Sequence, residues 1–226
     1  MGIKKLIKKI KKIKQPKVKF PKKWEIKDNE KILILSPHQD DESIGCGGLL
    51  SLYGKQCDII LLTDGRYGNP EWSEEETIKI RNLELKNAIE KCGANLIAKF
   101  NIEDSFLYKN INKTKNLKKI LNNYDYVLIP NPKELHPDHM VVKDVIKYNS
   151  KLKNKFKLIY YEVWTAIQNP THYIDISNVV QQKKELIANY KSQLKHIDYI
   201  SKILGLNFYR GILFNTDYCE VFELKI

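Results

Sequence analysis

Two short clusters of histidine and carboxylate residues are the part of this chain whose types and spacing could do chemistry. The first is SPHQDDE at residues 36–42, and the second is HPDH at residues 136–139. Three acids and an imidazole within five residues repel and desolvate one another unless a cation or a bound proton compensates them. We expect a divalent metal to be that compensating cation.

Each cluster follows an apolar run that is typical of a buried strand, at 32–35 and at 124–129. If the two strands are parallel, both clusters lie at the same edge of the sheet, where ligands bind in open α/β folds. Neutral imidazoles and a carboxylate are suitable zinc ligands, and a catalytic zinc site typically has three protein ligands and an open position. The residue types allow such a set to be drawn from His38, one of Asp40 and Asp41, and one of His136 and His139.

The elements that must position these clusters alternate between strand and helix from Lys31 onward. Predicted strands cover 31–36, 57–63, 95–100, 124–129, 156–164, 173–176 and 218–224. Predicted helices cover about 44–54, 73–91 and 114–122, a segment from about Met140, and two segments across 178–203. This alternation predicts an α/β fold, a Rossmann-like three-layer sandwich with a mostly parallel central sheet. We expect one domain over residues 31–226, preceded by a basic amphipathic extension at 1–30.

The glycines at 45, 47 and 48 raise the alternative of a dinucleotide site. The fingerprint G-x-G-x-x-G requires glycine or alanine at its last position, which is Leu50 here. The acidic cluster in front of these glycines would also repel a pyrophosphate. We therefore expect the glycines to allow close packing of a helix on the sheet.

The net charge of +12 belongs almost entirely to the N-terminal tail. Residues 1–23 contain eleven Lys and no acidic residue, and apolar side chains recur there at helical spacing until Pro16. Such a helix suits an anionic membrane surface, while a solvated tail is an equally good interpretation. Nucleic acid is not an expected partner, because no aromatic residues are interleaved with the lysines.

The location that we expect is the cytoplasm, with peripheral attachment to the inner face of the membrane as the added hypothesis. No apolar run approaches the ~20 residues that span a bilayer, and no continuous apolar segment follows the basic N-terminus as in a secretory signal. The four cysteines show no CxxC spacing and are expected to be reduced thiols.

At its two clusters the chain resembles the PIG-L/LmbE-like family of zinc-dependent N-deacetylases. The family's first motif, His-Pro-Asp-Asp-Glu, matches residues 38–42 with Gln39 in place of proline. The second motif, His-x-Asp-His, matches residues 136–139 in full. Weaker similarities, such as Arg81 with Glu84, extend the resemblance over roughly residues 31–223.

The resemblance implies a role for each motif position. It assigns three ligands to zinc, with iron or another divalent ion as the alternative: His38, Asp41 and His139. It implies that Asp40 is the general base and that His136 stabilises the oxyanion. Asp138 and Glu42 would orient ligand imidazoles or backbone groups, and a purely structural role suits these two equally well.

The implied activity is hydrolysis of the acetamide of an N-acetylhexosamine conjugate, such as a membrane-associated glycan precursor. Candidates for contact with the N-acetylated amino-sugar substrate are Arg66, Trp72 and Arg210, whereas Trp164 is expected in the core. Tyr190, where some relatives have histidine, would face the substrate. Two alternatives remain open, a zinc amidase or esterase acting on a non-sugar substrate and a non-catalytic sugar-binding module.

Overall fold

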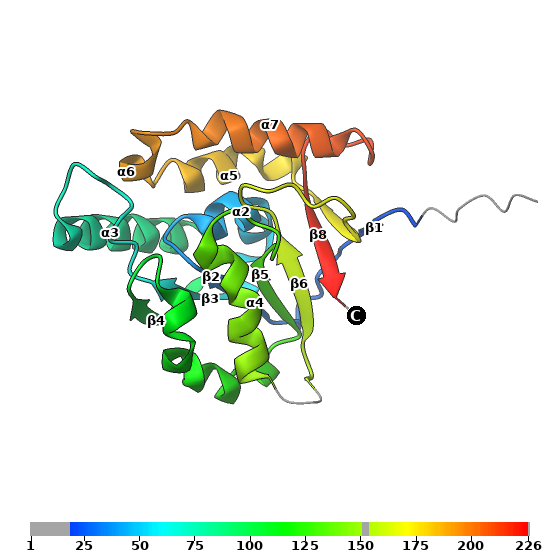
Figure 1. The fold of residues 1–226 in the computed structure, drawn as a ribbon. Helices are drawn as coiled ribbons and strands as arrows, with labels where there is room; N and C mark the ends of the chain where they lie inside the picture. The colour runs from blue at the N-terminus through cyan, green and yellow to red at the C-terminus, as the bar shows by residue number, and fades with distance from the viewer. Residues whose placement is uncertain (1–18, 151–153, 226) are drawn as a thin grey trace, which may run out of the picture.

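The chain folds around an eight-stranded sheet, seen here in a computed structural model that describes residues 19–150 and 154–225 (Figure 1). The order across the sheet is β1-β7-β8-β6-β5-β2-β3-β4. Only β8 runs antiparallel to its neighbours, β6 and β7, so the described sheet is mostly parallel as predicted. The strands are β1 (Lys22–Lys23), β2 (Ile32–Ser36), β3 (Cys57–Thr63), β4 (Asn95–Ile102), β5 (Tyr126–Pro130), β6 (Lys157–Tyr161), β7 (His172–Asp175) and β8 (Cys219–Lys225).

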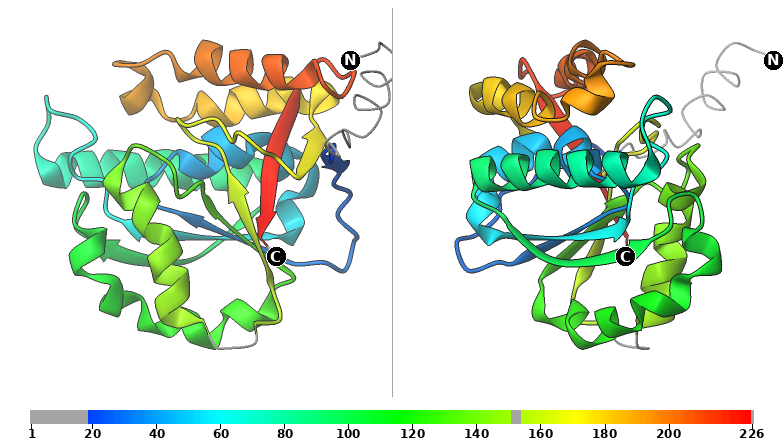
Figure 2. Two further views of the ribbon diagram at one scale, coloured as in Figure 1. Left: turned by 45° about the vertical axis from the view of Figure 1, so that its right-hand side comes forward. Right: turned by 90° about the vertical axis from the view of Figure 1, so that its left-hand side faces the viewer.

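Helices cover both faces of the sheet, which confirms the predicted layered α/β fold (Figures 1 and 2). On one side lie α2 (Asp41–Tyr53), α3 (Glu74–Cys92), α5 (Val180–Ile187), α6 (Lys191–Leu194) and α7 (Tyr199–Gly211). On the other side lie α4 (Pro137–Asn149) and the 3₁₀ helices η2 (Leu107–Lys109), η3 (Ile111–Lys119) and η4 (Leu121–Asn123). Two further 3₁₀ turns are η1 (Gly54–Gln56) and η5 (Ser177–Val179).

The interior strand β2 shows why the sequence folds into layers. All of its residues are buried, and successive side chains of a strand point to opposite faces. Ile32 and Ile34 pack in the apolar core beneath α2, whereas Leu33 and Leu35 pack in the second core beneath α4. A run that is apolar at every position therefore serves a strand covered on both faces, and its polar continuation emerges at the sheet edge.

Three elements differ from their predicted form. Residues 111–123 form 3₁₀ turns instead of an α-helix, in a stretch rich in lysine and asparagine. The helix expected from about Met140 begins at Pro137, because His136 caps its first turn. Three helices cover 180–211 where two were expected, since Asp198 accepts a hydrogen bond from the Ser201 N–H (3.0 Å) and starts α7 as a separate helix.

The packed domain begins before the boundary expected at residue 30. Lys22–Lys23 pair with β7, and Trp24 and Ile26 are buried in the core. The Trp24 ring meets those of Tyr126 and Phe222 edge-on, with centroids 4.9 and 5.2 Å apart. Residues 1–18, which hold most of the predicted amphipathic tail, lie outside the described residues. Within the described ranges, no helix has the length and apolar character needed to cross a membrane.

Candidate metal centre and active site

The turn between β2 and α2 delivers the first cluster to the carboxyl edge of the sheet. Asp40 in this turn has φ 132°, a conformation that a non-glycine residue keeps only where its surroundings enforce it. Glu42 supplies part of that enforcement, since its buried carboxylate accepts hydrogen bonds from Ser36 Oγ (3.1 Å), Ser43 Oγ (2.8 Å) and the Asp40 N–H (3.3 Å). The Tyr190 hydroxyl also donates to this carboxylate. Tyr190 is therefore buried behind the turn and does not line the cavity described below.

Three side-chain atoms from the two clusters converge on one point. His38 Nδ1 lies 3.3 Å from Asp41 Oδ2 and 3.2 Å from His139 Nε2, and the last two atoms are 3.2 Å apart. A metal ion about 2.0–2.1 Å from each of three tetrahedral ligands would space them about 3.3–3.4 Å apart. Two imidazole nitrogens and a carboxylate oxygen are also donors that zinc accepts. The residues present therefore fit a bound divalent metal.

The charges around this point are arranged to stabilise a cation. Burial by itself lowers the pKa of His38, but Asp104, Asp138 and Asp41 outweigh it and raise that pKa well above its ordinary value. Burial raises the pKa of Asp41, but attraction to His139 and His38 holds it well below the usual range. The buried carboxylates thus favour a positive charge at His38, which is the electrostatic condition for metal binding.

The far side of the His38 ring is held by two further carboxylates. His38 Nε2 lies 3.2 Å from Asp104 Oδ1 and 3.3 Å from Asp138 Oδ2. Asp138 is already engaged, because it accepts from the backbone N–H of Ser105 (2.7 Å) and Leu107 (3.1 Å). A carboxylate that accepts from the outer nitrogen of a ligand histidine fixes its tautomer and raises its basicity. We infer that this pair orients His38 and leaves Nδ1 free to bind metal.

Two other groups of potential ligands share His38, namely His38 with His136 and His139, and His38 with Asp104 and Asp138. Asp104 and Asp138 lie against Nε2 of His38, whereas Asp41 and His139 lie against its Nδ1. Asp104 was not predicted from the sequence. Its only signal there is that two acids, Glu103 and Asp104, follow β4 in the chain, at an edge of a parallel sheet where ligands gather.

Asp40 points into the same space without approaching the three ligand atoms as closely. Its Oδ1 lies 3.4 Å from Arg81 Nη2, and Arg81 also donates to the Gln39 carbonyl oxygen (2.8 Å). Burial raises the pKa of Asp40 above its ordinary value, while Arg81 opposes that rise. A carboxylate whose proton affinity lies closer to neutral pH is suited to take up and release a proton during catalysis.

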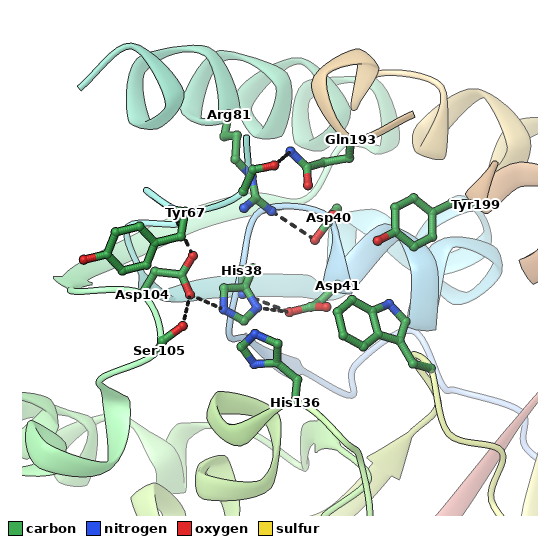
Figure 3. Close-up of a pocket in the computed structure, with 12 residues that line it drawn as sticks. His38, Asp40, Asp41, Tyr67, Arg81, Asp104, Ser105, His136, Gln193 and Tyr199 are labelled. Carbon is green, nitrogen blue, oxygen red and sulfur yellow. Dashed lines mark hydrogen bonds and ion pairs between the residues drawn. The ribbon is translucent and has the colours of Figure 1, made fainter. Parts of the chain in front are cut away.

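His136 faces the ligand histidines from the start of α4 (Figure 3). Its ring centroid is 4.6 Å from that of His38 and 5.0 Å from that of His139. The Asp138 N–H donates to His136 Nδ1 (3.3 Å), which places the ring proton on Nε2. Burial, with the neighbouring charges of His38 and His139, lowers the pKa of His136 to about 4. The ring is therefore a neutral N–H donor at physiological pH.

These groups open into a cavity of ≈ 260 Å³, close to the lower end of the range of about 300–1,000 Å³ for ligand clefts (Figure 3). It is lined by His38, Asp40, Asp41, Tyr67, Gly68, Arg81, Asp104, Ser105, His136, Trp164, Gln193 and Tyr199. His139 is fully buried behind this wall. Trp164, expected in the core, is 49% exposed, and its ring centroid lies 5.7 Å from that of His136.

The three predicted substrate contacts are not in this lining. Arg66 pairs with Asp64 (2.7 Å) and Glu74 (3.0 Å). Arg210 pairs with Glu162 and donates to the Ile167 carbonyl oxygen (2.8 Å). Trp72 is half-buried, outside the cavity wall. A substrate-binding role for these three remains a prediction.

One family of known proteins matches the part of the chain that holds both clusters. Residues 33–148, about half of the chain and including both clusters, match the family described as GlcNAc-PI de-N-acetylase (PIG-L). The chain is 29% identical to a diacetylchitobiose deacetylase of Thermococcus kodakarensis over 189 residues, covering 74% of this chain and 71% of that protein.

Two solved structures show the same fold. N,N'-diacetylchitobiose deacetylase from Pyrococcus horikoshii, in complex with its inhibitor MPG, superposes with a TM-score of 0.74 at 24% identity, covering 88% of this chain and 84% of that one. GalB, the 4-carboxy-2-hydroxymuconate hydratase of Pseudomonas putida, superposes with a TM-score of 0.69 at 19% identity, covering 87% and 96%. On its family match, which spans all five residues of the predicted centre, this chain belongs to the PIG-L family of GlcNAc-PI de-N-acetylases.

Proposed function

We propose that this protein is a metal-dependent N-deacetylase that hydrolyses the acetamide of a GlcNAc-type N-acetylhexosamine conjugate to an amine and acetate. The observation that carries the proposal is the convergence of His38 Nδ1, Asp41 Oδ2 and His139 Nε2 within 3.2–3.3 Å of one another, beside the Asp40 carboxylate and the neutral His136 imidazole. The family description and the diacetylchitobiose deacetylase relative support an N-acetylglucosaminyl substrate.

In this proposal His38, Asp41 and His139 hold the metal, with zinc as the first candidate and iron as the second. When bound, such an ion supplies a Lewis acid that lowers the pKa of water and polarises a carbonyl group. The remaining chemistry falls to side chains whose positions the structure gives, Asp40, Arg81 and His136.

Asp40 is the base. Its carboxylate takes a proton from water as the water oxygen bonds to the acetyl carbon, and it then gives that proton to the nitrogen as the C–N bond breaks. Arg81, 3.4 Å away, holds the carboxylate in place and offsets its charge. The C–N electron pair leaves with the amine, and the acetyl group leaves as acetic acid. Acetic acid then gives its proton to the amine or to solvent and becomes acetate, so atoms and charge balance.

His136 stabilises the negative charge that develops on the carbonyl oxygen. Its Nδ1 is occupied by the Asp138 N–H, so only its Nε2–H is free to donate toward the cavity. A donor fixed before the reaction costs little reorganisation, and removing one such donor typically lowers kcat by roughly 10²–10³.

Attachment to an anionic membrane surface is a separate part of the proposal, supported by the charge of residues 1–23 alone. It predicts that replacing Lys4, Lys5, Lys8 and Lys9 by glutamine weakens cosedimentation with vesicles that contain anionic lipid, and that added salt weakens binding of the unaltered chain. Equal cosedimentation of the two proteins would refute it.

The activity itself is tested by measuring bound metal and amine release on one purified sample. The substrates are N-acetylglucosamine, its methyl glycoside, a nucleotide-linked form and N,N'-diacetylchitobiose. We expect one metal per chain and amine release from at least one substrate, lost on chelation and restored by zinc or iron. One metal per chain with no amine released from any sugar, but turnover of simple non-sugar amides, would overturn the sugar assignment.

A further inference from the structure

A second cavity, of ≈ 470 Å³, adjoins the catalytic pocket and has a different chemical character. It lies between the loop after β6 and the first half of α7. Its lining is Val163, Trp164, Ala166, Ile197, Tyr199, Lys202, Ile203 and Leu206, and we call it the apolar groove. Of these eight residues only Lys202 is of a charged type, and its side chain is exposed.

The groove and the catalytic pocket are continuous, because Trp164 and Tyr199 line both. The Trp164 ring centroid lies 5.7 Å from that of His136 and 5.5 Å from that of His139. Tyr199 projects its hydroxyl into the catalytic pocket on the side of Asp40 (Figure 3). A substrate substituent that extends from the reacting centre between these two rings therefore enters the groove.

The groove has a buried floor and exposed walls. Val163, Tyr199 and Ile203 are at most 8% exposed, whereas Trp164 and Ile197 are 49% and 42% exposed. Large apolar side chains that gather around a cavity and stay in contact with water are typical of a binding surface. An occupant that covers them would release that water, which is a favourable term in binding.

Buried hydrogen bonds hold the groove in its open shape. The buried Glu134 carboxylate accepts from the backbone N–H of Val163 (3.0 Å) and Trp164 (3.1 Å), which ties the wall to the loop that carries His136. The ion pair of Arg210 with Glu162 joins α7 to the start of the loop after β6, next to Val163. The two walls are thus fixed relative to the catalytic residues, and binding requires little ordering.

We propose that the apolar groove binds an aliphatic chain attached to the amino sugar, so that the substrate class is an N-acetylhexosamine with an aliphatic aglycone. This rests on the proposed deacetylase function. In a 2-acetamido sugar the carbon that bears the acetamide is bonded to the anomeric carbon, so the aglycone begins beside the reacting group. The apolar floor and walls suit methylene groups, and the groove lining contains no buried charge that would require a polar partner.

The test compares kcat/KM for the methyl and n-octyl β-glycosides of N-acetylglucosamine, with the octyl glycoside below its micelle concentration. Each buried methylene improves binding by roughly two- to fourfold, so kcat/KM should be at least about tenfold higher for the octyl glycoside, mainly through KM. Ile197→Gln and Leu206→Gln, in the walls, should reduce that ratio. Phe208→Gln is the matched control, because Phe208 is an apolar side chain of α7 that is 58% exposed and outside the groove lining.

The outcomes separate this inference from the proposed function. The groove assignment is refuted, and the deacetylase activity is not, if both glycosides are turned over with nearly equal kcat/KM. It is also refuted if the two wall variants leave the ratio of the two kcat/KM values unchanged, as the Phe208 control does. If neither glycoside is turned over, the proposed function is decided by the remaining substrates of the panel, and the groove is decided by binding of n-octyl glucoside, which has no acetamide. Saturable binding that Ile197→Gln weakens and Phe208→Gln does not would sustain the groove, and no saturable binding would refute it.

Discussion

Replacing Asp104 by asparagine tests whether the outer nitrogen of His38 is held by a carboxylate so that the inner nitrogen can bind metal. Asp104 Oδ1 is 3.2 Å from His38 Nε2, and the residue is only 5% exposed. Asparagine has nearly the same shape and keeps one acceptor oxygen, so the substitution removes chiefly the negative charge. Without that charge the imidazole is a weaker base toward the metal.

The expected loss of metal affinity depends on how many carboxylates contact His38 Nε2. Loss of such an outer partner typically lowers metal affinity or activity by about 10–100-fold. Asp138 Oδ2, 3.3 Å from Nε2, retains its charge in the variant, so we expect Asp104→Asn to lower metal affinity by about tenfold. Asp104→Ala should lower it further, because that change also removes the acceptor of the Tyr67 N–H (3.3 Å).

Competition for zinc against a chromophoric chelator measures this affinity on the full chain. Glu103→Gln is the matched control, because the neighbouring carboxylate accepts from the Tyr67 hydroxyl (2.9 Å) and does not contact His38. Circular dichroism of the metal-free proteins checks that each variant is folded. Metal affinity of Asp104→Asn within twofold of the unaltered chain would refute the assigned role of Asp104.

Two further predictions concern stability, measured as the free energy of unfolding in urea. Lys183→Met should lower it by about 3–5 kcal/mol, because it leaves Glu220 buried without its cationic partner at 2.7 Å. Lys86→Met, which breaks an exposed ion pair, should lower it by under about 1 kcal/mol. Equal losses in the two variants would contradict this prediction. Trp24→Ala should lower the free energy of unfolding by about 3–5 kcal/mol, whereas Phe20→Ala, at an exposed position, should lower it by about 0.5 kcal/mol or less. If Trp24→Ala left the free energy of unfolding unchanged, residues before 30 would not belong to the packed domain.

The fold could be predicted from the sequence because its strands are apolar runs and polar segments separate them. The runs at 32–35 and 57–63 are apolar at nearly every position, which only strands covered on both faces require. The segment 111–123 has isolated apolar residues, and its 3₁₀ form depends on contacts with α4 that the sequence does not reveal. Trp24 and Ile26 fall within the predicted extension because the first predicted strand begins at Lys31, yet the contacts that bury them involve β7 and β8.

The candidate site was predictable where its residues stand together in the chain. His38, Asp41 and His139 belong to two dense clusters, and parallel strands bring such clusters to one edge. Asp104 and Tyr199 reach the site from segments outside the two clusters, so no motif spacing in the sequence predicts them. Trp164 resembles a core residue because the strand β6 precedes it, and only the turn anchored by Glu134 exposes its ring.

The turnover number of Asp40→Asn, with metal content determined on the same sample, tests the central claim most directly. Asparagine has nearly the same shape as aspartate, so the turn at residue 40 should keep its shape while losing the base. With the best substrate of the panel, we predict one metal per chain and a kcat lower by about 10²–10⁴-fold. A kcat within tenfold of the unaltered enzyme, at full metal content, would contradict the assignment of Asp40 as the base.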